Sequence, residues 1–156
     1  MIAHLPWSPL PFGRYEGKTL PQVVLRDADW FFWALGKQIF RHNLAEESQD
    51  IAYKARHIKI PKPDPENWKI NYVTDHDGNF ARFSIVTAQN ALFGKLPGHT
   101  ASYLDLSCPR MWKKYDKLGC TLMLRSFRYH YFGGLKLTKE RCDVFFSDAA
   151  NFVWSA

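Results

Sequence analysis

Residues 68–87 read WKINYVTDHDGNFARFSIVT, and this stretch decides the fold class. Ile70 and Tyr72 alternate with polar neighbours, and such a two-residue period is typical of a half-buried strand. The next five residues, 75–79, have the sequence DHDGN, which favours a turn, and the residues after it resume the strand pattern. The stretch therefore predicts a β-hairpin near residues 69–87.

Helical patterns flank this hairpin on both sides. Asp27 can cap a helix over about residues 28–41, because its carboxylate can accept hydrogen bonds from the first backbone amides of a helix. Residues 44–60 place acidic side chains before basic ones, the order that a helix dipole favours, and we expect these charges to form a solvated face. Thr138 can cap a final helix that runs to about residue 152. We therefore expect an α+β fold, with several helices around a small antiparallel sheet that contains the hairpin.

The length of the chain, 156 residues, suits a single domain that covers residues 1–156. Hydrophobic residues make up 46% of the composition and aromatic residues 16%, which favours a packed core over a disordered chain. The proline-rich connection at residues 61–65 interrupts helical backbone, because the residue before each proline avoids the helical region. We expect this connection to mark at most the end of an N-terminal submodule, residues 1–60.

The sequence predicts a cytoplasmic protein with no membrane association. Cys108, Cys120 and Cys142 cannot all pair, and none lies in a C-x-x-C motif, so we expect buried free thiols in a reducing compartment. The first twelve residues lack the apolar run and basic leader of a signal peptide. The longest apolar run, Trp30–Leu35, is far shorter than the roughly 20 residues that cross a bilayer.

The net charge of +6 is concentrated in the last third of the chain, where residues 109–156 hold nine Lys and Arg against four Asp and Glu. Such an excess favours a polyanionic partner, most often nucleic acid. If residues 109–132 form one helix that starts at Pro109, six cations share one arc of about 120°. These cations are Arg110, Lys113, Lys114, Lys117, Arg125 and Arg128.

Two alternatives remain open for this stripe of cations. Gly119 can end the helix after Leu118, in which case residues 120–131 form a strand and only the first four cations stay together. The stripe can also be an ordinary solvated helix face. Asp116 is the only carboxylate within residues 109–132, whereas a solvated face stabilised by ion pairs would interleave both signs of charge. The scarcity of carboxylates favours phosphate binding.

A second pattern lies near the N-terminus. Residues 12–20 read FGRYEGKTL, and a helix start with the sequence DADWFFWAL follows at residues 27–35. The two glycines, four residues apart, suit a tight loop with positive φ. Over roughly residues 11–36 this pattern resembles the small module at the C-terminus of exodeoxyribonuclease X-like proteins. The matching residues are Phe12, Gly13, Arg14, Tyr15, Gly17, Lys18 and Trp33.

The resemblance implies an accessory module that binds nucleic acid or a protein partner, because the module accompanies DNA-processing enzymes and has no catalytic residues of its own. The sequence departs from the module where Arg14 replaces the usual lysine and Glu16 replaces a second basic residue. Phe12, Val23 and Trp33 can equally be core residues, which would leave only the polar positions of the loop for a ligand.

The leading hypothesis is a non-catalytic, nucleic-acid-associated accessory protein of bacterial or phage type, with no cofactor, no metal and no catalytic residue. Tyr15 would stack on a base, and the cations would contact phosphates. The residues expected to bind nucleic acid are Arg14, Tyr15, Lys18, Arg110, Lys113, Lys114, Lys117, Arg125 and Arg128.

Two other classes of function are compatible with the sequence. The first is a protein-interaction module that docks on a host or DNA-processing enzyme through an aromatic surface. The second is a metal-dependent nuclease that would use Asp75, Asp77, Asp105 or His99. A calcium loop that begins at Asp75 is not expected, because its twelfth residue is Val86 and not a glutamate.

Overall fold

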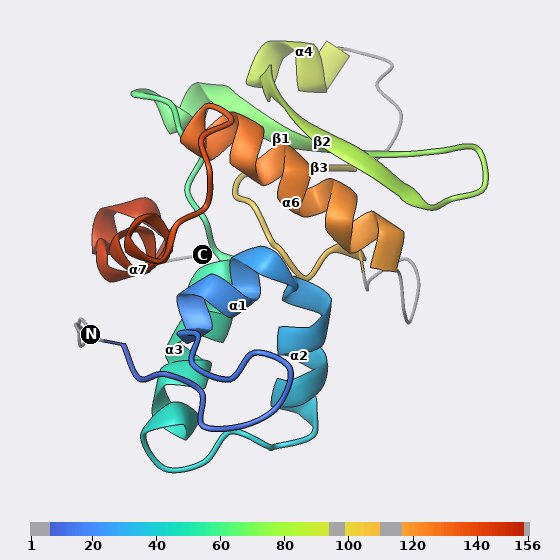
Figure 1. Cartoon of the computed structure of the whole chain (residues 1–156). Helices are drawn as coiled ribbons and strands as arrows, with labels where there is room; N and C mark the ends of the chain where they lie inside the picture. Colours follow the sequence, from blue (N-terminus) through green and yellow to red (C-terminus); the bar gives the residue numbers. More distant parts are fainter. Residues whose placement is uncertain (1–6, 94–98, 110–116, 155–156) are drawn as a thin grey trace.

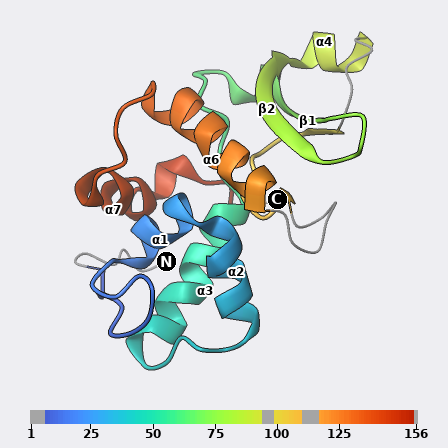
Figure 2. The ribbon, with the colours of Figure 1, turned by 45° about the vertical axis from the view of Figure 1, so that its right-hand side comes forward.

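The computed structural model describes residues 7–93, 99–109 and 117–154. In these ranges the chain forms six α-helices and a three-stranded antiparallel sheet, which confirms the expected α+β class. The helices are α1 (Leu20–Arg26), α2 (Ala28–Gly36), α3 (Asn43–Arg56), α4 (Ala88–Phe93), α6 (Lys117–Phe132) and α7 (Lys139–Ser147), with the short 3-10 helices η1 (Pro65–Asn67) and η2 (Ala149–Asn151). Figures 1 and 2 show α6 between the sheet on one side and helices α1, α2 and α3 on the other. None of the helices described is both long enough and apolar enough to cross a bilayer.

The sheet contains the predicted hairpin, and its strand order is β2-β1-β3. The strands are β1 (Trp68–Thr74), β2 (Phe80–Thr87) and β3 (His99–Ala101). The register of the hairpin pairs Ile70 with Ile85. In its turn, Asp75 Oδ1 accepts hydrogen bonds from the backbone N–H groups of Asp77 and Asn79, both at 2.9 Å. These bonds stabilise the ionised carboxylate, so the pKa of Asp75 lies below its ordinary value.

Helix α2 begins where the sequence predicts, and α1 precedes it directly. Thr19 caps α1 and Asp27 caps α2, each with its side chain accepting a hydrogen bond from a backbone N–H of the first turn. Gly13 and Gly17 have φ values of +77° and +84°, so the loop takes the conformation that glycine favours. Helix α2 ends five residues earlier than predicted, because Gln38 adopts a φ of +56° that a continuing helix excludes.

Helix α6 decides between the alternatives for residues 120–131. It is unbroken over its 16 residues, so this segment is helical and the strand alternative is wrong. Gly119 is buried in the first turn beside Cys120, whose Sγ accepts a hydrogen bond from the backbone N–H of Asp29 at 3.3 Å. A glycine inside a helix costs about 1 kcal/mol relative to alanine. Packing of α6 against α2 and β2 offsets this cost.

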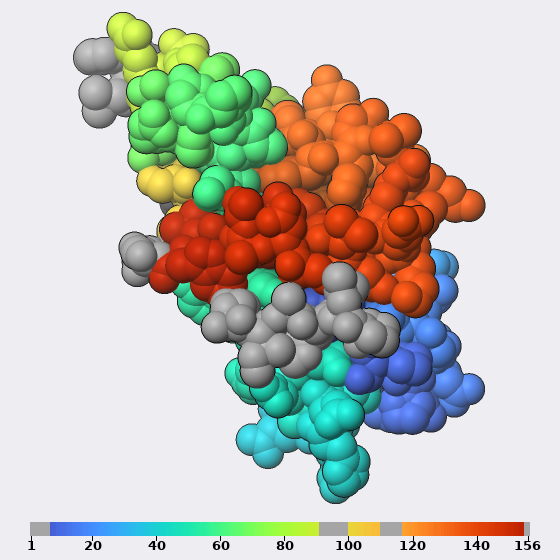
Figure 3. All heavy atoms as spheres, turned by 90° about the vertical axis from the view of Figure 1, so that its left-hand side faces the viewer, coloured from blue at the N-terminus to red at the C-terminus, as the bar shows by residue number. Residues whose placement is uncertain are grey.

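One hydrophobic core extends from Trp7 to Phe152 and takes side chains from both sides of the proline-rich connection. Its C-terminal part is aromatic, with Phe145 at the centre. The rings that meet Phe145 edge-on are those of Phe127, Tyr131, Phe132, Phe146 and Phe152. The last described residues also pack on the protein, since Trp154 stacks on Tyr53 with ring centroids 5.3 Å apart. Figure 3 shows this C-terminal segment running across one face of the molecule, above α3.

Lys54 of α3 corrects the expectation that the charges of this helix form a solvated face. Its side chain is only 1% exposed, and Nζ donates hydrogen bonds to Asp50 Oδ2 at 2.9 Å and to the backbone oxygen of Phe146 at 2.8 Å. The ring centroids of Trp7 and Phe152 lie 5.4 and 5.7 Å from Nζ. This buried cation therefore joins both terminal segments of the described chain to α3.

The three cysteines, Cys108, Cys120 and Cys142, are free and buried, as the sequence predicts. Burial raises the pKa of Cys120 to about 11 and the pKa of Cys142 to about 12. It also raises the pKa of Cys108 above its ordinary value. The thiols therefore stay protonated at neutral pH, where a nucleophilic cysteine would need to be a thiolate.

Candidate nucleic-acid interface

The exposed side of α6 carries part of the predicted stripe. Lys117, Arg125 and Arg128 are all exposed on the side of the helix that turns away from β2. On the opposite side, His130 contacts Phe83 of β2, with ring centroids 5.1 Å apart. The other three cations of the stripe lie outside the described residues; they are Arg110, Lys113 and Lys114.

The turn after α6 brings a second set of cations next to the first. Arg128 Nε donates hydrogen bonds to the backbone oxygens of Gly134 at 3.1 Å and Leu135 at 2.8 Å. Arg141 Nη1 donates a hydrogen bond to the backbone oxygen of Lys136 at 2.7 Å. The cations of α6 and α7 are thus held at the two ends of one short turn.

Helix α1 extends this positively charged surface. Lys18 and Arg26 line a hollow of about 120 Å³ together with Leu137 and Cys142, so α1 and the start of α7 lie side by side. Figures 1 and 2 show the same arrangement of the two helices. We call the combined surface the basic face. Its residues are Lys18, Arg26, Lys117, Arg125, Arg128, Lys136, Lys139 and Arg141.

Acidic side chains are scarce on the basic face. From residue 117 to residue 141 the sequence contains six Lys and Arg and a single acid, Glu140. Asp143 follows, but it is buried and both of its oxygens have partners. Its Oδ1 accepts a hydrogen bond from Thr19 Oγ1 at 2.6 Å, and its Oδ2 accepts one from Lys139 Nζ at 2.7 Å. Lys139 is therefore paired, and the face as a whole keeps a positive excess.

The cations at the start of α7 stand where helix stability favours anions. Because the N-terminus of a helix carries partial positive charge, the dipole of α7 repels Lys139 and Arg141 in its first turn. Thr138 caps this end by accepting a hydrogen bond from the backbone N–H of Arg141 at 3.2 Å. The i,i+4 ion pair with Asp143 accounts for Lys139. Arg141 has no such pair among the described residues, and a bound phosphate would be attracted both by its guanidinium group and by the dipole.

The N-terminal loop contributes cations to the surface and no stacking aromatic. Tyr15 is only 8% exposed, and its hydroxyl donates a hydrogen bond to Asp27 Oδ2 at 2.6 Å, so its ring cannot stack on a base as predicted. Burial, and then the bond to this carboxylate, raise the pKa of Tyr15. Arg14 is exposed and pairs with the same carboxylate at 3.8 Å. Of the possible core residues of the loop and helix, Val23 is buried but Trp33 is 46% exposed.

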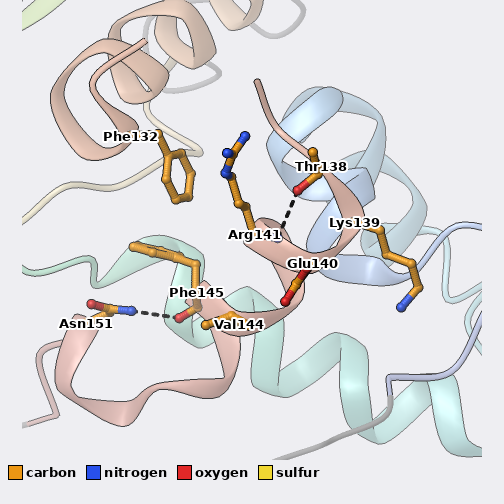
Figure 4. Close-up of a pocket in the computed structure, with 8 residues that line it drawn as sticks. All are labelled: Phe132, Thr138, Lys139, Glu140, Arg141, Val144, Phe145 and Asn151. Carbon is orange, nitrogen blue, oxygen red and sulfur yellow. Dashed lines mark hydrogen bonds between the residues drawn. The ribbon is translucent and has the colours of Figure 1, made fainter. Parts of the chain in front are cut away.

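A larger hollow lies beside the basic face, between the end of α6 and α7. It has a volume of about 770 Å³, and the residues that line it are Phe132, Thr138, Lys139, Glu140, Arg141, Val144, Phe145 and Asn151. Figure 4 shows the two phenylalanine rings on one side of the hollow, with the side chains of Arg141 and Glu140 on the other. The hollow therefore combines an aromatic wall with a cation of the basic face.

Asp75 and Asp105, two of the residues considered for a nuclease, have other roles in the structure. Among the residues that the structure describes, no three His, Cys, Asp or Glu side chains lie close enough to hold a metal ion. Asp75 serves the hairpin turn, and Asp105 Oδ1 accepts hydrogen bonds from Ser107 N at 2.8 Å and Ser107 Oγ at 2.6 Å. Both carboxylates thus have local structural roles, and the nuclease hypothesis gains no support from them.

Sequence reasoning missed half of the basic face. The missed cations are Arg26, Lys136, Lys139 and Arg141. A count of charges from the end of α6 onward would have found three of them, since only Glu140 interrupts that run. No sequence signal identifies Arg26, because it joins the face only through the packing of α1 against α7.

Comparison of the chain with protein-family models, with curated proteins and with solved structures gives no match. The resemblance to the exodeoxyribonuclease X-like module therefore stays a prediction from the residues quoted for it.

Proposed function

We propose that this protein is a non-catalytic, nucleic-acid-binding accessory protein that contacts phosphates with its basic face. The observation that carries the proposal is the set of exposed cations on α6, the following turn and the start of α7, with a single acid between residues 117 and 141 and with Arg26 of α1 beside α7. A surface built for stability would interleave both signs of charge. A surface of one sign attracts a polyanion and releases its counterions on binding.

Two further features agree with this proposal. The N-terminal resemblance, with Arg14 exposed and Lys18 on the basic face, points to an accessory of DNA-processing enzymes in a bacterium or phage. The three free thiols favour a reducing compartment, and we propose the cytoplasm as the site of action.

Salt dependence of DNA binding tests the proposal. Fluorescence anisotropy would follow a labelled duplex of about 20 base pairs from about 50 to about 200 mM salt. If about five phosphates are neutralised, the logarithm of the association constant should fall with a slope of about −4 to −5 against the logarithm of the salt concentration. Absence of binding to either DNA or RNA at low salt would refute the proposal.

Paired variants assign the binding to the basic face. Arg125→Gln and Lys136→Gln should each make the salt slope shallower by about 0.9 and weaken binding to all sequences alike. Lys37→Gln is the matched control, because Lys37 is exposed and directly follows the last residue of α2. Figure 1 shows this end of α2 away from α6 and α7. An equal effect of all three substitutions would show that binding follows net charge and not this surface.

A protein partner is the second candidate, and exposed apolar side chains beside the basic face favour it. These side chains are Leu118, Tyr129, Leu135 and Val144. Contiguous exposed apolar surface marks protein interfaces. A complex held by such contacts would persist at high salt, where contacts to phosphate are screened. Capture of one defined partner at high salt, combined with no affinity for nucleic acid, would favour this candidate over the first.

A further inference from the structure

We infer that the hollow between α6 and α7 holds one unstacked base of a bound single strand of nucleic acid, while the basic face holds the phosphates of the same strand. The inference rests on the proposed function and adds a substrate class to it, namely single strands in preference to duplexes. Its starting point is the position of the hollow, since Lys139 and Arg141 belong both to its lining and to the basic face.

The aromatic wall of the hollow suits the flat face of a base. Phe145 meets its neighbouring rings at interplanar angles of 69° to 87°, and Phe132 meets Phe127 at 77°. Within the described part of the chain, no ring is therefore stacked parallel on either phenylalanine. Phe145 is only 9% exposed and Phe132 is half-buried, so Phe132 is the ring that a base can reach more fully. Single-strand-binding proteins place bases on such aromatic side chains, which accept every base because every base has a π-face.

Polar groups around the wall suit the edge of a base and its phosphate. Arg141 donates one N–H to the backbone oxygen of Lys136, and a guanidinium group has five N–H donors, so others remain for a phosphate. Glu140 offers carboxylate oxygens, which accept hydrogen bonds from the amino groups of bases. Asn151 Nδ2 donates to the backbone oxygen of Phe145 at 2.9 Å, which leaves its amide oxygen as a second acceptor. The volume of about 770 Å³ lies within the range of small-molecule sites, about 300–1,000 Å³.

The preference for a single strand over a duplex follows from the need for a base to enter the hollow. A duplex presents phosphates to the basic face but keeps its bases paired and stacked, so filling the hollow would require a base to be flipped out. A single strand offers unstacked bases without the free-energy cost of flipping a base out of a duplex. Because charge density is higher on a duplex, phosphate contacts alone would favour the duplex. Tighter binding of a single strand would therefore report contact with the base.

Two variants with matched exposure separate the hollow from the basic face. Val144 and Leu135 are both 55% exposed, but only Val144 lines the hollow. Val144→Glu and Leu135→Glu each add one negative charge beside the basic face, and neither removes a buried side chain. Circular dichroism would confirm that both variants fold. Anisotropy would compare four probes: a single-stranded DNA, the RNA of the same sequence, the corresponding DNA duplex, and the single-stranded DNA with its bases removed at abasic sites.

We expect the wild-type protein to bind a single strand more tightly than the duplex or the abasic strand. The DNA and RNA probes show which sugar is preferred, and a preference of either strand over the duplex supports the inference. Val144→Glu should weaken binding of the single strand about 5- to 150-fold, the effect of removing one stacking contact. It should weaken duplex binding only as much as Leu135→Glu does.

Two outcomes would overturn the inference and leave the proposed function intact. One is affinity for the duplex that equals or exceeds affinity for both single strands. The other is an equal loss of single-strand binding in Val144→Glu and Leu135→Glu. Failure of every probe to bind at low salt would overturn the proposed function together with the inference.

Discussion

Replacing Lys54 by methionine removes the ammonium group that joins both terminal segments to α3, while it keeps most of the length of the side chain. Nζ would no longer donate hydrogen bonds to Asp50 Oδ2 and to the backbone oxygen of Phe146. The side chain of Asp50 is only 14% exposed, so its carboxylate would be left largely buried without its cation. We therefore expect Lys54→Met to fold less stably than the wild-type protein.

The magnitude follows from the two acceptors that lose their donor. A buried acceptor without a partner costs about 1–3 kcal/mol, and breaking a buried ion pair costs about 3–5 kcal/mol. Because Asp50 keeps some access to water, we expect the free energy of unfolding to fall by about 3 kcal/mol. For a chain of this size, 1 kcal/mol shifts Tm by about 2–4 °C, which predicts a decrease of about 6–12 °C.

Urea denaturation followed by tryptophan fluorescence measures this loss. Lys37→Met is the control, because it makes the same substitution at an exposed lysine and should change stability by less than about 0.5 kcal/mol. The double variant Asp50→Asn, Lys54→Met should be more stable than the sum of the single effects predicts, since no unpaired charge remains. A Lys54→Met variant within about 1 kcal/mol of the wild type would refute the account of this buried cation.

Three further predictions concern stability. Burial raises the pKa of all three thiols above 9.0, so the unfolded chain releases these protons first as the pH rises. The contribution of the thiols to stability should be constant below about pH 8 and should fall above about pH 9 by about 1.4 kcal/mol per pH unit for each thiol. Cys142→Ala should therefore show a shallower loss of stability in alkaline denaturation. Tyr15→Phe removes the hydrogen bond to Asp27 and should lower the free energy of unfolding by about 1.5 kcal/mol with no change in the salt slope of DNA binding; a changed slope would contradict the buried role of this ring. Trp154→Ala removes a ring stacked on Tyr53 and should lower thermal stability by about 1–2 kcal/mol, and an unchanged Tm would show that the contact is not formed in solution.

Local signals in the sequence were sufficient for the hairpin and for the starts of α2 and α7. The carboxylate of Asp75 and the positive φ of Gly78 form the turn within five residues, and Asp27 caps α2 through a backbone N–H three residues away. Such features depend only on neighbouring residues, so they can be predicted without knowledge of the fold. Helix α4 had a similar signal that was missed, since Thr87 Oγ1 accepts a hydrogen bond from Asn90 N at 3.1 Å.

Features that depend on distant residues could not be predicted in the same way. Lys54 lies in a segment whose order of charges is typical of a solvated helix. Its burial depends on Trp7, Phe146 and Phe152, which contact it only in the folded chain. Tyr15 likewise loses its predicted stacking role because the loop folds its hydroxyl onto α2. In the candidate interface, single cations could be identified from charge, but the place of Arg26 beside α7 depends on the packing of α1 against α7.

The contacts of Lys54 also restrict when the chain can finish folding during its synthesis. The backbone oxygen that binds its ammonium group belongs to a residue 92 positions later in the sequence. When α3 leaves the ribosome, this acceptor does not yet exist, and the cation has only Asp50 and water as partners. We therefore expect helices α1 to α3 to complete their packing only after residue 146 has been synthesised, although the three helices are close together in sequence. Their packing depends on contacts between residues far apart in the sequence. Nascent chains stalled before residue 146 should be cleaved by protease within α3, and chains released at full length should be protected there.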